Sequence, residues 1–134
     1  MKALVQRMSE AGVAVGCRAV AQIGRGLLVL LCVEKGDGPD EARRLARKIA
    51  RLRIFDDETG KMNRTVVETA GRALVVSQFT LAADLRRGHR PGFAGAAPPA
   101  AAKALYERLA VLLAEEGVPV ETGEFAACAW RFVW

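Results

Sequence analysis

The sequence predicts an α+β fold in which a mixed, largely antiparallel sheet is covered by two helices. Strand-like residues fill residues 2–33 and return near the end of the chain. Two segments with helical periodicity lie in between, at residues 36–55 and 97–117. The 134 residues contain no linker, repeat or low-complexity segment. We therefore expect a single domain over residues 1–134, because a chain of this length can bury one core.

Residues 2–33 are expected to form a succession of strands. Apolar and polar residues alternate irregularly in KALVQRMS, which indicates a strand. The next segment, GVAVGCRAVAQIG, indicates two short strands around a turn at Gly16 and Cys17. The third, GLLVLLCVE, is apolar throughout, which is typical of a central strand covered on both faces.

The first helix is predicted by GDGPDEARRLARKIARLRIF. Pro39 suits its first turn, and Asp40 and Glu41 complement the positive end of the helix dipole. Its apolar stripe consists of Ala42, Leu45, Ala46, Ile49 and Leu52. Its other faces carry Arg43, Arg44, Arg47, Lys48 and Arg51. This basic ridge could follow the phosphates of a nucleic acid, or it could be a solvated helix face.

The second helix is predicted by APPAAAKALYERLAVLLAEEG, which begins after two prolines and stops at Gly117. Its apolar stripe consists of Ala102, Leu105, Tyr106, Leu109, Leu112 and Leu113. Residues 56–63 contain Gly60 and lack the ligand spacing of a calcium-binding loop, so we expect a surface turn there. The last segment, VPVETGEFAACAWRFVW, returns to strand-like residues.

Composition favours a basic cytoplasmic protein. The net charge is +5 and the pI is about 9.6, which suits a polyanionic partner such as a nucleic acid, although a solvated basic surface is equally consistent. No apolar run is long enough to span a bilayer, and the N-terminus lacks a signal-peptide pattern. Three cysteines without a C-x-x-C pair argue against a disulfide framework or a zinc site, so we expect no metal.

A strand that ends in polar side chains marks the candidate site. ALVVSQF is expected to form a strand, yet it finishes in Ser77, Gln78, Phe79 and Thr80. Because successive strand residues face opposite ways, one face can present all four only if the strand breaks there and offers backbone N–H groups too. A Ser77–His89–Asp84 triad has no nucleophile-elbow motif around it. A Thr80 nucleophile is a second enzymatic interpretation of these residues. A strand end with capping hydroxyls is the purely structural alternative.

A basic loop, LRRGHRPGF, follows this strand. It places Arg86, Arg87, His89 and Arg90 within five positions and adds Phe93 as a possible stacking aromatic. Arginines beside an aromatic ring suit contact with phosphate or RNA. A solvated surface loop is the alternative interpretation.

Several blocks of the chain form a recognisable pattern when they are taken together. They are MKALVQR, GRGLLVLLCVEKGD, ARKIARLRIFDDETGKMN, VVSQFTLAAD, RRGHRPGF, AAPP and GVPVETGEF. In this order and spacing the chain resembles the D-aminoacyl-tRNA deacylases, the D-tyrosyl-tRNA(Tyr) deacylase family. The resemblance extends from Met1 to about Phe125.

The resemblance implies an enzyme that hydrolyses the ester between a D-amino acid, or mischarged glycine, and the 3′ end of tRNA. It implies a barrel-like sheet, a cytoplasmic homodimer, tRNA as the partner, no membrane or DNA partner, and no cofactor. The mechanism would depend on the terminal 2′-hydroxyl of the tRNA, with protein backbone groups positioning the ester and a water. By the same resemblance, Ser77, Gln78, Phe79 and Thr80 are catalytic. The substrate-binding residues would be Arg7, Met62, Asn63, Leu81 and Pro98. Clustering in the basic loop, rather than the resemblance, makes Arg86, Arg87, His89 and Arg90 the expected tRNA-binding residues.

The end of the chain departs from the family pattern. Family members end in an Asn-x-Gly-Pro-Val-Thr motif whose Gly-cisPro peptide excludes L-amino acids from the pocket of the partner subunit, and Arg7 would help to hold it. Here the similarity fades after Phe125 into AACAWRFVW, and the only Gly-Pro dipeptide is Gly38-Pro39. We therefore expect a shortened C-terminus without the chiral gate.

Four outcomes stay open at this point. The deacylase could have lost L/D discrimination, the tail could gate the neighbouring pocket with other residues, or a degenerate or truncated member could bind tRNA without turnover. A plain hydrolase of small esters that uses Ser77 or Thr80 is the fourth.

Overall fold

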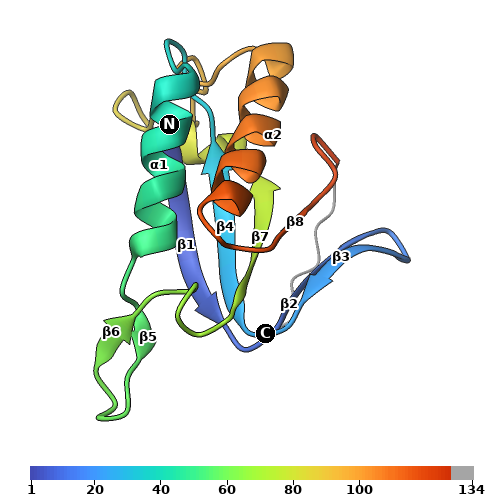
Figure 1. Ribbon diagram of the computed structural model, residues 1–134. Coiled ribbons are helices and arrows are strands. Elements are labelled where there is room, and N and C mark those ends of the chain that lie inside the picture. Colours follow the sequence, from blue (N-terminus) through green and yellow to red (C-terminus); the bar gives the residue numbers. More distant parts are fainter. Residues whose placement is uncertain (128–134) are drawn as a thin grey trace.

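A four-stranded sheet forms the centre of the computed structural model, which describes residues 1–127 (Figure 1). Its strands lie in the order β1 (Lys2–Met8), β4 (Gly26–Cys32), β7 (Arg72–Ser77) and β8 (Val120–Thr122). β1 pairs antiparallel with β4, whereas the β4–β7 and β7–β8 pairs are parallel. The mixed sheet confirms the α+β prediction. Within the described residues the sheet stays open, so the barrel-like closure expected from the resemblance is not found.

Both predicted helices are present and cover the same face of this sheet (Figure 1). α1 (Pro39–Arg51) begins at its proline, and the Glu41 carboxylate accepts a 2.7 Å hydrogen bond from the Gly38 N–H just before it. α2 (Pro99–Glu115) ends before Gly117, whose φ of +98° suits glycine at a helix end. Neither helix is long and apolar enough to cross a membrane.

The opposite face of the sheet is partly covered by a hairpin of β2 (Ala11–Val15) and β3 (Arg18–Ile23). The hairpin packs on Leu28, Leu74 and Val76, while the helices pack on alternate residues of the same strands. β4 is therefore covered on both faces, as its apolar sequence predicts. Beside the hairpin, Leu4 of β1 remains 54% exposed opposite its partner Leu30.

The chain order places the loops of interest at one edge of the sheet. After β4 the chain passes through α1 and a small hairpin, β5 (Phe55–Asp56) and β6 (Met62–Arg64), before it enters β7. A short 3₁₀ helix, η1 (Phe79–Ala82), and α2 then connect β7 to β8. Because β4 and β7 are parallel, both end at the same edge, and the loops that lead into the two helices start there.

Candidate active site

The strand β7 breaks where its sequence becomes polar. It ends at Ser77, and η1 begins at Phe79. The intervening Gln78 is held by its backbone N–H, which donates a 2.7 Å hydrogen bond to the Leu31 carbonyl. The first amides of η1, at Phe79 and Thr80, have no acceptor inside the short helix. The strand therefore breaks at the point where a break is needed for one face to present residues 77–80 together.

The break opens onto a cavity of about 400 Å³. Three of the four predicted catalytic residues line it, namely Ser77, Gln78 and Phe79, whereas Thr80 is not part of its wall. The remaining wall is formed by Cys32, Val33, Ala96, Ala97, Pro99, Ala102, Phe125, Ala126 and Ala127. Most of the wall is therefore formed by small or apolar residues, and Ser77 and Gln78 at the end of β7 are its polar members.

Hydrogen bonds fix the walls of the cavity to the core. The Tyr106 hydroxyl of α2 donates to the Val75 carbonyl at 2.8 Å and lies 3.2 Å from the Gly123 carbonyl. The Tyr106 ring also lies against Phe125, with 5.7 Å between the ring centroids. Burial raises the pKa of Tyr106 to about 12, so the hydroxyl stays protonated as a donor. On the opposite wall, the Ala97 N–H donates to the Val33 carbonyl at 3.0 Å.

Among the described residues, the side chains around the cavity do not assemble a nucleophile with its base. Burial raises the pKa of the Cys32 thiol, whose sulfur lies 3.6 Å from the Phe79 carbonyl, and the protonated thiol is a poor nucleophile. The Gln78 amide donates to the Thr80 hydroxyl. Arg86 binds the Asp84 carboxylate and lowers its pKa to about 2, and within residues 1–127 no hydrogen bond joins Asp84 to His89 or Ser77.

An aromatic pair stands at the mouth of the cavity. Phe79 is 57% exposed, and its ring packs edge-on against Phe93 with 5.2 Å between centroids. Phe93 therefore supports the exposed Phe79 ring, which is free to stack on a planar ligand.

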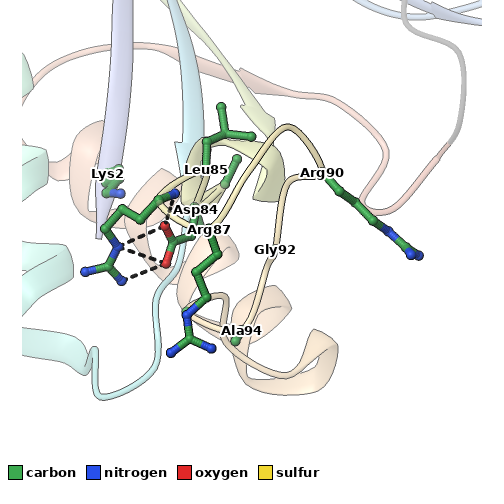
Figure 2. Close-up of a pocket in the computed structure, with 11 residues that line it drawn as sticks. Lys2, Asp84, Leu85, Arg87, Arg90, Gly92 and Ala94 are labelled. Carbon is green, nitrogen blue, oxygen red and sulfur yellow. Dashed lines mark hydrogen bonds and ion pairs between the residues drawn. The ribbon is translucent and has the colours of Figure 1, made fainter.

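The basic loop forms a second, more open hollow next to β1. Backbone bonds between Asp84 and Gly92, at 2.8 and 3.0 Å, close the base of the loop. The Arg86 guanidinium donates to the Asp84 carboxylate at 2.6 Å. Figure 2 shows Arg87 and Arg90 extending from the loop in different directions. Both of these arginines line the hollow, and His89 is exposed but does not line it.

The structure separates the predicted substrate-binding residues into two groups. Leu81 lies in η1, and Pro98 caps α2 beside the cavity wall. The other three lie away from this cavity. Arg7, near the far end of β1, binds the Asp56 carboxylate at 2.9 Å and the Ile54 carbonyl at 3.0 Å, and β6 carries Met62 and Asn63.

Several wall residues were not identified from the sequence as part of the site. Ala102 lines the cavity although its sequence context predicts only the apolar stripe of a helix, and no sequence pattern predicts a role for Phe125. Tyr106, predicted in the same stripe, is not part of the wall, but its hydroxyl binds β7. The run AAPPAAA was a usable signal, because small residues at a helix start leave room for a ligand. The predicted tail AACAWRFVW begins at the cavity wall with Ala126 and Ala127, and its residues 128–134 lie outside the described part.

The chain matches the family model for D-Tyr-tRNA(Tyr) deacylase over residues 4–129. It is 61% identical over 127 residues to the D-aminoacyl-tRNA deacylase of Ruegeria pomeroyi, covering 95% of this chain and 88% of the relative. It is 58% identical, with the same coverage, to the D-aminoacyl-tRNA deacylase of Cereibacter sphaeroides (strain ATCC 17029).

Solved structures show the same fold. The c-Myc DNA Unwinding Element Binding Protein superposes with a TM-score of 0.90 at 35% identity, covering 98% of this chain and 89% of that one. A probable eukaryotic D-amino acid tRNA deacylase superposes with a TM-score of 0.78 at 18% identity, covering 98% of this chain and 92% of that one, and this likeness concerns the fold alone.

Proposed function

The chain belongs to the D-Tyr-tRNA(Tyr) deacylase family, and from this premise we propose that it hydrolyses the ester between a D-amino acid and the 3′ end of tRNA at the cavity beside β7. The observation that carries this proposal is the break after Ser77, which places Ser77 and Gln78 in the wall of a cavity whose other lining residues are mostly small or apolar. The same activity would act on glycine mischarged onto tRNA, and it belongs in the cytoplasm, where aminoacylated tRNA is used.

Positioning, rather than a protein nucleophile, would perform the reaction. We assign catalytic roles to Ser77, Gln78, Phe79 and Thr80 through their backbone and polar groups, which would hold the ester carbonyl and a water. The terminal 2′-hydroxyl of the tRNA would assist this water. Fixed donors that face a developing oxyanion can lower the barrier of ester hydrolysis without a covalent intermediate. The absence of an assembled triad within residues 1–127 supports this mechanism.

The mouth of the cavity suits the end of an RNA strand. The exposed ring of Phe79, supported by Phe93, could stack on the terminal adenine. Leu81 and Pro98 would complete the binding site on this side. Arg86, Arg87, His89 and Arg90 would contact phosphates near the 3′ end, with Arg87 and Arg90 the more available because Arg86 is paired with Asp84.

A homodimer would account for the second group of substrate-binding residues. Leu4 and Leu30 leave an apolar strip on the sheet beside the β2–β3 hairpin, and a second copy of the chain could cover it. Arg7, Met62 and Asn63 lie away from the cavity of their own subunit, so we assign them to the cavity of the partner subunit.

A deacylation time course with D-tyrosyl-tRNA and L-tyrosyl-tRNA side by side tests the proposed activity. Hydrolysis of the D-ester alone is the result expected from an enzyme with a working chiral gate. Hydrolysis of both esters would indicate a deacylase that has lost L/D discrimination. If a folded sample hydrolyses neither, the proposal is wrong, and binding of tRNA without turnover becomes the function that the basic loop supports.

A second experiment separates this mechanism from a plain hydrolase of small esters. Thr80→Ala should keep most of the activity, whereas a substrate whose terminal adenosine lacks the 2′-hydroxyl should be hydrolysed far more slowly. A Thr80 nucleophile predicts the reverse, with activity lost in the variant and indifferent to the 2′-hydroxyl. Ser77→Ala provides the matched measurement for the other hydroxyl at the end of β7.

A further inference from the structure

We propose that the exposed basic face of α1 binds the phosphate backbone of the tRNA stem and so docks the body of the substrate. The inference rests on the proposed function, because it supplies a surface for the part of the tRNA that cannot enter the cavity. We define the α1 basic face as Arg43, Arg44, Arg47, Lys48 and Arg51. All five side chains are exposed.

The spacing of these residues forms a track along the helix. Arg43, Arg47 and Arg51 are four residues apart and lie in one row, with Arg44 and Lys48 in the adjacent row. At 1.5 Å of rise per residue the row is about 12 Å long. Successive phosphates of one strand in a nucleic-acid duplex lie only a few ångströms apart along the axis, so the row is long enough to face several of them. Four of the five side chains, together with Leu52, line a shallow hollow of about 430 Å³.

Local stability does not account for the charges of this face. Lys48 and Arg51 complement the negative end of the helix dipole, but Arg43 and Arg44 lie nearer the other end and gain nothing from it. Two ion pairs are present, between Arg44 and Glu41 at 3.4 Å and between Arg47 and Glu116 at 3.5 Å. Both are long and exposed, and such pairs contribute little to stability. Among the described residues, Arg43, Lys48 and Arg51 have no carboxylate within 4.0 Å.

The neighbouring helix shows that a basic face is no requirement of the fold. α2 covers the same face of the sheet and carries two cations, Lys103 and Arg108, against two carboxylates, Glu107 and Glu115. α1 carries five cations against Asp40 and Glu41. The opposite side of α1 is buried against the sheet, so this helix has no apolar face to insert into a membrane. A polyanion that binds from outside is the partner that suits it.

The position of α1 suits a substrate that is already held at the cavity. Cys32 ends β4 in the cavity wall, and α1 begins at Pro39 at the same edge of the sheet before it runs back along the strands (Figure 1). The turn before α1 also contacts the segment that follows the basic loop, since the Lys35 N–H donates to the Gly95 carbonyl at 3.0 Å. A stem whose 3′ end reaches the cavity can therefore continue past the basic loop and along α1.

Two matched double variants test this assignment. The first neutralises α1 with Arg43→Gln and Lys48→Gln, and the control neutralises α2 with Lys103→Gln and Arg108→Gln. Each removes one arginine and one lysine, and glutamine keeps helix propensity nearly unchanged. For each protein, kcat/KM is measured on D-tyrosyl-tRNA and on D-tyrosine esterified to a short oligonucleotide ending in CCA. Binding of uncharged tRNA is measured across a range of salt concentrations.

The α1 variant should lose on the order of tenfold in kcat/KM on D-tyrosyl-tRNA and keep its rate on the short ester. Its tRNA affinity should also depend less on salt, with the slope of log K against log salt smaller by about two. The α2 control should match the wild type within about twofold in both respects. The assignment would be overturned if the α1 variant kept the wild-type kcat/KM on D-tyrosyl-tRNA and the wild-type salt slope. It would also be overturned if the α1 variant lost as much kcat/KM on the short ester as on the tRNA, or if the α2 control lost as much as the α1 variant. If the wild-type protein hydrolyses neither ester, the proposed activity fails, and the salt dependence of tRNA binding alone decides the role of α1.

Discussion

Helices α1 and α2 lie side by side on one face of the central sheet but pack on it with different side chains (Figure 1). α1 buries three alanines and Ile49, whereas α2 buries Tyr106 and three leucines. Burial of a leucine or tyrosine removes far more apolar surface from water than burial of an alanine. α2 also begins at the cavity, where Pro99 and Ala102 form part of the wall, and its Tyr106 hydroxyl binds β7.

The difference shows that the buried and exposed faces of a helix can serve separate purposes. Three alanines and Ile49 dock α1, and its outer face carries five cations that are available to an external partner. The outer face of α2 carries as many carboxylates as cations, and its inner face supplies residues to both the core and the cavity wall. We therefore expect variants of α2 to affect stability and the cavity, and variants of the exposed α1 residues to affect mainly contact with the tRNA.

The largest effect is expected for Leu113→Ala in α2. Leu113 is fully buried in the core that the helices share with the sheet, so the truncation should lower the free energy of unfolding by about 2–5 kcal/mol. Val111→Ala is the matched control on the same helix, because Val111 is 48% exposed and should change the value by less than about 0.5 kcal/mol. Urea denaturation measures both. A loss below about 1 kcal/mol for Leu113→Ala would contradict the view that α2 provides the main packing.

Much of this division could be predicted from the sequence. The apolar run GLLVLLCVE predicted a strand covered on both faces, and β4 is one because the helices and the hairpin pack on alternate residues. The prolines and apolar stripes predicted both helices, whose starts at Pro39 and Pro99 agree with the structure. These features were predictable because they depend on local backbone preference and on the periodicity of side chains.

The composition of the site was less predictable, because contacts remote in sequence create it. Phe125 reaches the cavity wall just after β8, whose parallel pairing with β7 joins segments about 45 residues apart in sequence. The position of Gln78 is held by the Leu31 carbonyl, which is 47 residues upstream. Arg7 lies with Asp56 rather than beside Ser77, because β1 runs antiparallel to β4 and its end points away from the cavity. The prediction that Ser77 to Thr80 are catalytic came from the family resemblance rather than from side-chain spacing.

The next largest effect is expected for Ala102→Leu, which tests the role of α2 as cavity wall. Ala102 lies in the first turns of α2, and a leucine would project three extra carbons into a cavity of about 400 Å³. We expect kcat/KM on D-tyrosyl-tRNA to fall at least about tenfold, which corresponds to roughly 1.4 kcal/mol of transition-state binding. Ala101→Leu is the control, because Ala101 is exposed on the same turn and does not line the cavity. Unchanged kcat/KM for Ala102→Leu would place the substrate elsewhere.

The smallest effect is expected for Tyr106→Phe, which removes only the hydroxyl that joins α2 to β7. The Val75 carbonyl keeps a second donor, the Gly123 N–H at 3.1 Å, so the loss in the free energy of unfolding should be about 1 kcal/mol at pH 7.

The same variant also tests how the stability depends on pH. The pKa of Tyr106 is about 12 in the folded protein, above the ordinary tyrosine value of about 10 in the unfolded chain. Between these values the folded state holds the proton more often than the unfolded state, so the stabilisation is complete below pH 10 and is lost as the pH rises towards 12. The stability difference between wild type and Tyr106→Phe should therefore narrow over this range in urea denaturation, whereas a constant difference would show that the hydroxyl is not buried against β7.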